Sequence, residues 1–298
     1  MTARGMAPGS KRKANRMNID AHQHFWRYNP AHQVWMTDRM DVLRRDHLPA
    51  ELRPMLEAAG FQGTVAVQAR QMLEETAWLL KLSDEHDFIR GVVGWVDLRS
   101  PDLRGQLERF AAHPKLAGVR HVVHDEPDDD FMLAPAFRRG IAALREFGLV
   151  YDLLLFPRHL PVAARLAAEF PDQPFVLDHI AKPPIREGGM SPWREDLRAL
   201  AAFSNVTCKL SGMVTEAAWK QWRPETFRPY LDAVVDAFGP DRLMIGSDWP
   251  VCTLSGDYAS TMAVVTDYAR QLPAGARDAI LGGTCARVYR LRQPRGTP

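Results

Sequence analysis

The chain has 298 residues, three cysteines and a formal net charge of +2. This length suits a single α/β barrel, which needs roughly 250 residues. Three distant cysteines argue against both a disulfide framework and a cysteine-rich zinc site. The basic residues within 1–16 account for more than the whole net charge, so the remainder is mildly acidic. That balance gives no indication of a nucleic-acid partner.

Residues 1–16 predict a disordered basic leader, followed by one domain over residues 17–298. The leader lacks the apolar core of a secretory signal, and its shortage of serine argues mildly against a transit peptide. Met6 and Met17 are alternative natural starts. No apolar run is long enough to span a bilayer, so we expect no membrane partner. The three distant cysteines favour a reducing, cytoplasmic setting.

Beyond the leader, apolar runs alternate with helical patterns. Apolar runs cover residues 19–26, 63–70, 89–98, 116–124, 149–156, 175–180, 206–211 and 242–250. Helices are expected over residues 49–59, 71–86, 101–112, 134–147, 160–170, 192–203, 226–238 and parts of 256–292. Eight nearly continuous apolar strands that alternate with helices predict a (β/α)8 TIM-type barrel. A doubly wound open sheet is the alternative, although the chain has no glycine-rich nucleotide-binding motif.

The first strand carries two histidines two residues apart. Side chains alternate across a strand, so Asp20, His22 and His24 are expected on one face. Two imidazoles at this spacing can converge on a metal ion or on the oxygen of a polarised carbonyl. The long connection from Trp26 to Pro49 is a candidate substrate loop, because it exceeds what a structural connection needs.

Most of the other predicted strands begin apolar and end polar. The polar residues at these ends are Gln68, Arg70, Arg120, His121, His124, Asp178, His179, Lys209, Ser211 and Asp248. In a barrel the carboxyl ends of the strands meet at one face, which carries the active site. Buried polar groups need partners, so we expect these side chains to share one cavity.

Several polar residues also have structural interpretations. Asp178 is expected on the opposite face from His179, where it orients a neighbour. Lys209 is expected to pair with a carboxylate, and Asp152 fits a buried ion pair at least as well as a catalytic role. Four histidines in loops or on helices are expected at the surface: His32, His47, His86 and His113. His121 is expected behind the site or facing a helix. For His159 two places stay open, the pocket and a loop.

Asp-x-His-x-His on the first strand, a histidine after the sixth and an aspartate after the eighth resemble the amidohydrolase superfamily. Five longer segments resemble its lactonase branch, which opens sugar lactones and pyrone-dicarboxylate lactone. These segments are Asp20–Trp26, Gly118–His121, Phe175–Pro183, Cys208–Gly212 and Met244–Pro250. The resemblance runs from about residue 18 to the last helix. The sugar lactonases look closest, and among them those that act on L-fuconolactone.

This resemblance implies hydrolysis of a small sugar lactone to the open hydroxy acid. It implies that Asp248 is the general base, with a pKa raised among the histidines of a dry pocket. His22, His24 and His179 would hold or polarise the lactone carbonyl. Arg120, Gln68 and Arg70 would bind sugar hydroxyls or stabilise the oxyanion. We also expect Trp26, with Trp35 and Trp249, to form an apolar wall against a sugar face, although packing in the core or in a lid suits Trp35 equally well. His124 is expected to share the face of Arg120.

The sequence departs from the metal-rich pattern of the superfamily. The fourth strand supplies no bridging lysine and the fifth ends in no obvious histidine, which argues against a two-metal centre. Zinc on His22, His24, His179 and Asp248 stays open as a single site. We expect no required cofactor, in a site that can still bind one divalent ion.

Two other functions stay open beside the lactonase. One is a metal-dependent decarboxylase of the same superfamily, which shares the histidine pair, His179 and Asp248. The other is a non-catalytic barrel that binds a sugar acid. Barrels of this size often form homo-oligomers, but no segment of the sequence identifies an interface.

Overall fold

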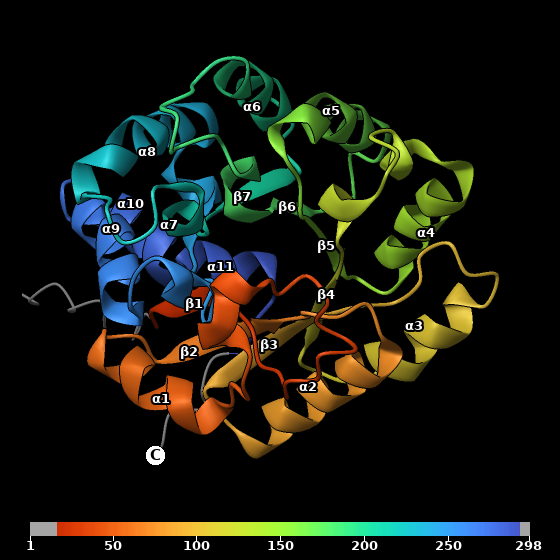
Figure 1. The fold of residues 1–298 in the computed structure, drawn as a ribbon. Helices are drawn as coiled ribbons and strands as arrows, with labels where there is room; N and C mark the ends of the chain where they lie inside the picture. The colour runs from red at the N-terminus through yellow and green to blue at the C-terminus, as the bar shows by residue number, and fades with distance from the viewer. Residues whose placement is uncertain (1–16, 293–298) are drawn as a thin grey trace, which may run out of the picture.

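The computed structural model describes residues 17–292, so the predicted disordered leader lies outside the described residues. Eight parallel strands lie in chain order in one sheet (Figure 1). They are β1 (Ile19–Gln23), β2 (Gly63–Val67), β3 (Ile89–Gly94), β4 (Leu116–His121), β5 (Val150–Leu153), β6 (Phe175–Leu177), β7 (Val206–Leu210) and β8 (Leu243–Ile245). Gln23 forms a parallel bridge with Trp249 beyond β8, which closes the seam between the last strand and the first. The predicted (β/α)8 barrel is confirmed, and the open-sheet alternative is wrong.

Helices surround the barrel, and most of them bury apolar side chains in the core between helices and strands (Figure 1). They are α1 (Pro49–Ala58), α2 (Leu73–Glu85), α3 (Leu103–Ala111), α4 (Pro135–Glu146), α5 (Leu160–Glu169), α6 (Trp193–Ala201), α7 (Met213–Glu216), α8 (Pro224–Phe238), α9 (Tyr258–Arg270), α10 (Ala274–Asp278) and α11 (Thr284–Val288). Proline at the first position starts α1, α4 and α8, where its missing N–H costs nothing. Within residues 17–292, no helix combines the length and the apolar character needed to cross a membrane.

Short helical turns fill most of the loops between these elements. They are η1 (Asp38–Leu43), η2 (Val123–Asp125), η3 (Phe131–Leu133), η4 (Pro157–His159), η5 (Asp178–Ala181), η6 (Pro240–Arg242), η7 (Val251–Leu254) and the π-helical η8 (Ala279–Gly283). Four of them directly follow a strand, or lie within a few residues of its carboxyl end: η2, η4, η5 and η7. These turns therefore determine where the polar residues after the strands point.

The inside of the barrel holds a small apolar layer of its own. Side chains from most of the strands fill this layer, among them Ile19, Val65 and Val176. Cys285 and Tyr289, in and just after α11, pack into the same layer from below. The three cysteines, Cys208, Cys252 and Cys285, are buried and free. The inner layer makes the barrel a packed core rather than a channel.

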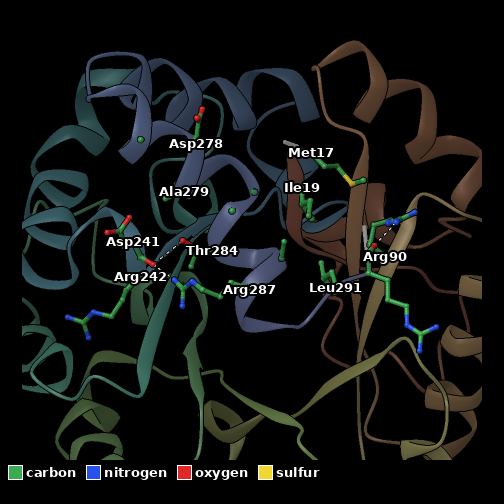
Figure 2. A pocket seen from close by; sticks show the side chains of 15 residues that line it. Met17, Ile19, Arg90, Asp241, Arg242, Asp278, Ala279, Thr284, Arg287 and Leu291 are labelled. Atoms are coloured by element: carbon green, nitrogen blue, oxygen red, sulfur yellow. Dashed lines mark hydrogen bonds between the residues drawn. The ribbon is translucent and has the colours of Figure 1, made fainter. Parts of the chain in front are cut away.

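A large cavity of about 970 Å³ lies at the amino-terminal end of the strands (Figure 2). Its walls come from the starts of β1 and β3 and from α10, η8 and α11. Arg90 donates to the backbone carbonyl of Arg292, and Arg287 donates to that of Asp241. None of the predicted site residues lines this cavity. The predicted site residues therefore lie away from this end of the barrel.

Candidate active site

A cavity of about 680 Å³ lies at the carboxyl ends of the strands. Seven predicted site residues line it: His24, Trp26, Arg70, Arg120, His124, His179 and Asp248. Trp35 and His32 of the connection after β1 line it too, so that connection forms part of the cavity wall. His22 and Gln68 are fully buried and do not line it. The structure therefore brings the predicted residues together in two layers, one at the cavity and one beneath it.

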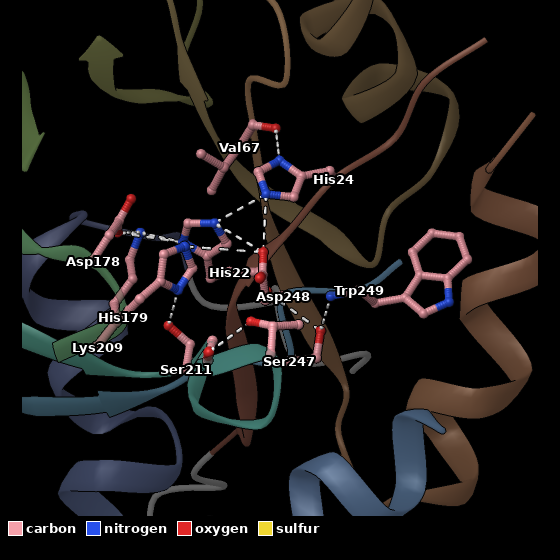
Figure 3. Close-up of polar contacts among 12 residues, drawn as sticks. His22, His24, Val67, Asp178, His179, Lys209, Ser211, Ser247, Asp248 and Trp249 are labelled. Atoms are coloured by element: carbon pink, nitrogen blue, oxygen red, sulfur yellow. Dashed lines mark hydrogen bonds and ion pairs between the residues drawn. The ribbon is translucent and has the colours of Figure 1, made fainter. Parts of the chain in front are cut away.

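Three imidazoles and one carboxylate converge at the floor of this cavity (Figure 3). We call His22, His24, His179 and Asp248 the upper cluster. Nε2 of His22 lies 3.1 Å from Nε2 of His24. Oδ1 of Asp248 lies 3.2 Å from Nε2 of His24, 3.7 Å from Nε2 of His22 and 4.0 Å from Nε2 of His179. Residues from three distant parts of the sequence thus meet around one carboxylate oxygen.

The partners of these imidazoles determine which nitrogen carries a proton. Nδ1 of His24 lies 2.8 Å from the carbonyl oxygen of Val67, so it must donate there. Arg120 donates to Nε2 of His22 over 3.3 Å, so that nitrogen accepts. The proton of His22 is then assigned to Nδ1, which lies 3.3 Å from Oδ1 of Asp178 and 3.2 Å from Nζ of Lys209. His22 therefore turns an unprotonated Nε2 towards Asp248, and His24 does the same when its ring is neutral.

This donor set fits a divalent cation. Two bare imidazole nitrogens and a carboxylate oxygen, all within 3.7 Å of one another, repel each other unless positive charge lies between them. His22, His24 and Asp248 can hold a metal ion together, and so can His22, Asp178 and His179. Imidazole nitrogen with carboxylate oxygen is a ligand set typical of zinc.

Burial and neighbouring charges shift the titration of the upper cluster. Burial lowers the pKa of His22 and His179 well below the usual value, so both rings are neutral at pH 7. Burial raises the pKa of Asp248, but His179 and His24 outweigh it and hold that pKa below its ordinary value. The expected upward shift for Asp248 is therefore wrong, because the neighbouring His179, His24 and Lys182 favour its charged form more than burial opposes it. Asp248 is ionised at neutral pH.

Asp20 does not share a face with the histidines, which corrects the simple alternation. The pairing of β1 with β2 shifts register between Asp20 and Gln23. Because of this irregularity, the carboxylate of Asp20 accepts from the N–H of Ser247 at 2.9 Å and from its hydroxyl at 2.6 Å. Tyr258 of α9 donates to it as well, over 3.1 Å. Asp20 thus fastens β1 to the segment that carries Asp248.

A left-handed turn follows β6 and places the next part of the site. Four consecutive non-glycine residues, 179–182, have φ between 49° and 60°. Such residues cost roughly 1–2 kcal/mol each in this conformation, so the surroundings must hold the turn. Trp193 donates to the carbonyl of Ile180 over 2.7 Å, and His179 Nδ1 lies 2.9 Å from the Ser211 hydroxyl. Backbone strain of this kind clusters at functional sites.

The turn corrects one prediction and adds one residue. The strand ends at Leu177, so alternation no longer applies, and both Asp178 and His179 reach the site. Lys182 at the end of the turn lines the cavity and lies 3.7 Å from Glu216. The sequence analysis does not identify Lys182 as a site residue. The only signal was its position three residues after His179, where one helical turn brings both to the same side.

A second buried group lies beneath the upper cluster. We call Asp152, Lys209 and Tyr289 the lower cluster; none of their side chains has more than a trace of exposed surface. Lys209 Nζ lies 2.5 Å from Asp152 and 2.9 Å from Asp178, and the Tyr289 hydroxyl donates to Asp152 over 2.8 Å. The predicted pairing of Lys209 and the ion-pair interpretation of Asp152 are confirmed. Asp178 joins the two clusters, since it also contacts His22.

The remaining predicted residues surround the floor of the cavity. Gln68 accepts from Arg120 over 3.1 Å and does not reach the cavity itself. Arg70 pairs with the buried Glu75 at 3.0 Å. His124 stacks on Phe156 with ring centres 4.7 Å apart. Trp26 lines the cavity, and its indole N–H donates to carbonyls of the connection after β1.

Three aromatic or histidine predictions need correction or refinement. Trp249 is buried and does not line the cavity, so it forms no part of an apolar wall there. His47 is fully buried rather than at the surface. Its ring packs edge-on against Trp26 and Trp249, with centroid distances of 5.2 Å and 5.3 Å. His159 is also buried, where it lies 3.1 Å from Asp129 outside the cavity.

Comparison with known proteins agrees with this geometry. An L-fucono-1,5-lactonase from Burkholderia multivorans is 44% identical over 289 residues, which cover 93% of this chain and 97% of that protein. An L-fucono-1,5-lactonase from Burkholderia ambifaria is 40% identical over 284 residues, with the same coverage of both chains. A crystal structure of an amidohydrolase from Burkholderia multivorans with bound zinc is 44% identical, has a TM-score of 0.90, and covers 93% of this chain and 100% of that one. A family model described as amidohydrolase matches residues 19–291. The chain belongs to the amidohydrolase family.

Proposed function

We propose that this enzyme hydrolyses a sugar lactone, of the L-fucono-1,5-lactone type, to the open hydroxy acid. The observation that carries this proposal is the ionised Asp248 at the floor of the cavity, whose Oδ1 lies 3.2 Å from Nε2 of His24 and 4.0 Å from Nε2 of His179. Two relatives at 40–44% identity are L-fucono-1,5-lactonases, which supports the same substrate class. The cavity volume of about 680 Å³ leaves ample room for one sugar ring.

In the proposed reaction Asp248 accepts a proton from water as the water oxygen bonds to the lactone carbonyl carbon. The carbonyl oxygen becomes an oxyanion. The bond between the carbonyl carbon and the ring oxygen then breaks, and the proton on Asp248 passes to that ring oxygen. The product is a hydroxy acid, which releases one proton at neutral pH. Each step therefore needs only the lactone, one water molecule and the carboxylate.

The cavity cations would stabilise the oxyanion. His22 and His24 present bare Nε2 atoms, so in this state neither ring has a proton to donate to the carbonyl oxygen. Arg120 and Lys182 line the same cavity and carry positive charge. A well-placed donor of this kind lowers the barrier by roughly 3 kcal/mol. Arg70, His124 and Trp26 would contact the sugar ring.

A second part of the proposal concerns whether a zinc ion takes part in the hydrolysis. His22, His24 and Asp248 would hold one zinc ion, which would polarise the lactone carbonyl as a Lewis acid. Asp178 would orient His22 through Nδ1 whether or not an ion is bound. We propose that turnover proceeds with the chain's own residues and that zinc is not obligatory, since a lactone is a reactive ester.

The test is acid release from a panel of lactones, followed with a pH indicator. The panel holds L-fucono-1,5-lactone, its D-sugar counterparts, a simple aliphatic lactone and an aromatic carboxylate. Protein is assayed before and after chelator treatment, against the spontaneous opening of each lactone. We expect acid release only from sugar lactones, and we expect it to survive chelation.

The other outcomes separate the parts of this proposal. Loss of activity on chelation that zinc restores would contradict the metal-independent part alone. Release of carbon dioxide from the aromatic carboxylate, without lactone opening, would replace the proposed hydrolase by a decarboxylase. Tight binding of sugar acids with no lactone opening would leave a binding protein.

A further inference from the structure

We infer that Arg120 and a divalent cation compete for one lone pair, that of Nε2 of His22. Arg120 of β4 donates to this nitrogen from NH1 over 3.3 Å. An imidazole nitrogen without a proton carries a single in-plane lone pair. A zinc ion would coordinate the same lone pair at about 2.0–2.1 Å. Arg120 therefore has to leave His22 before His22 can bind the ion.

The contact of Arg120 with His22 is built into the fold. Arg120 is only 4% exposed. Its NH1 also donates to Oδ2 of Asp178 over 3.0 Å, and its NH2 donates to the backbone and side-chain oxygens of Gln68 at 2.5 Å and 3.1 Å. These two partners hold the guanidinium in place from both sides. They also remain available to Arg120 when it gives up His22.

The charge of the site favours the same conclusion. The bare nitrogens of His22 and His24 and the carboxylate of Asp248 need positive charge among them. The guanidinium of Arg120 supplies that charge from within the chain. Bound zinc would duplicate it, and two neighbouring cations in a buried site repel each other. Arg120 thus weakens zinc binding twice, by occupying the lone pair and by its charge.

Zinc affinity measures this competition directly. The dissociation constant is determined by competition with a chromogenic chelator, for wild type and for Arg120→Met. We expect Arg120→Met to bind zinc about tenfold more tightly or more, in the range that neighbours of metal ligands control. Arg70→Met is the matched control, because Arg70 lines the same cavity but pairs with Glu75 and touches no member of the donor set. Its zinc affinity should stay within about threefold of wild type.

Two results would overturn the inference. One is an Arg120→Met variant that binds zinc no more tightly than wild type. The other is equal tightening in Arg120→Met and Arg70→Met, which would make overall positive charge the cause. No substrate enters this measurement, so its outcome is independent of whether the protein opens lactones.

A second variant covers the case in which Arg120→Met does not fold. Gln68→Met removes the two side-chain hydrogen bonds between Gln68 and Arg120 and keeps the charge of Arg120. We expect it to tighten zinc binding by about twofold to fivefold, and no gain in that variant would contradict the inference. A crystal structure of the zinc-loaded wild type adds a geometric check. Arg120 should contact Asp178 and Gln68 but not His22; a guanidinium still bonded to Nε2 beside the ion would overturn the competition.

Discussion

The upper and lower clusters are equally buried, but only the lower one balances its own charges. In the lower cluster, Lys209 contacts Asp152 at 2.5 Å and Asp178 at 2.9 Å. In the upper cluster, acceptors face acceptors, with His22 and His24 only 3.1 Å apart at Nε2. Buried polar groups that lack partners cost stability, so such an arrangement persists where function requires it. We therefore expect the lower cluster to stabilise the fold and the upper cluster to carry out the proposed hydrolysis.

The largest effect on stability should come from Lys209→Met. This change leaves the carboxylates of Asp152 and Asp178 buried without their shared cation. Breaking a buried pair in this way costs about 3–5 kcal/mol of unfolding free energy, measurable by urea denaturation. Lys182→Met is the control, because Lys182 is partly exposed and 3.7 Å from Glu216, and we expect it to cost at most about 1 kcal/mol. A loss as small as the control's would contradict the stabilising role of the lower cluster.

A smaller loss is expected for Tyr289→Phe. Tyr289 donates to both carboxylate oxygens of Asp152, at 2.9 Å and 2.8 Å. A hydrogen bond to a charged group contributes about 1.5–3 kcal/mol, so urea denaturation should show a loss in that range. Activity should change little, because Tyr289 does not line the active-site cavity. Tyr268→Phe is the control, because it removes a similar hydrogen bond to the partly exposed Asp232. Equal losses of unfolding free energy in both variants would mean that burial does not strengthen the hydrogen bond of Tyr289.

Asp248→Asn should change stability least. The substitution removes a negative charge from among acceptors, and an amide N–H can donate to the bare Nε2 of His24, now 3.2 Å from Oδ1. We expect the unfolding free energy to stay within about 1 kcal/mol of wild type or to rise. Asp152→Asn, made in the lower cluster, should instead lower the unfolding free energy by several kcal/mol, because it breaks the ion pair with Lys209. Equal destabilisation by the two substitutions would remove the distinction between the clusters.

The sequence predicts the barrel well because its signal is repeated. Each of the eight apolar runs contains a strand, and α1–α6 and α8 lie within a few residues of their expected bounds, whereas the sequence does not predict the short α7. The polar residues at the strand ends also locate the candidate site, since parallel strands bring their carboxyl ends to one face. A misplaced single residue changes little in a pattern that recurs eight times.

The finer geometry could not be predicted, because it depends on local departures from regular structure. Alternation fails at Asp20, where β1 shifts register, and again at Asp178, where β6 has already ended. Nothing in the letters of residues 179–182 indicates a left-handed turn, since none of them is glycine. The turn exists because Trp193 and Ser211, both distant in sequence, hold it. The burial of His47 could not be predicted for a similar reason, since Trp26 and Trp249 contact it only in the folded chain.

The most direct test of the account measures opening of L-fucono-1,5-lactone by nuclear magnetic resonance, with chelator-treated wild type and Asp248→Asn side by side. Spontaneous opening is subtracted with a protein-free sample. General-base catalysis contributes about 10²–10⁴-fold, so Asp248→Asn should lower kcat/KM by that factor while the chelated wild type keeps its rate. Undiminished turnover by Asp248→Asn would contradict the assignment of the base, and with it the central role given to the upper cluster.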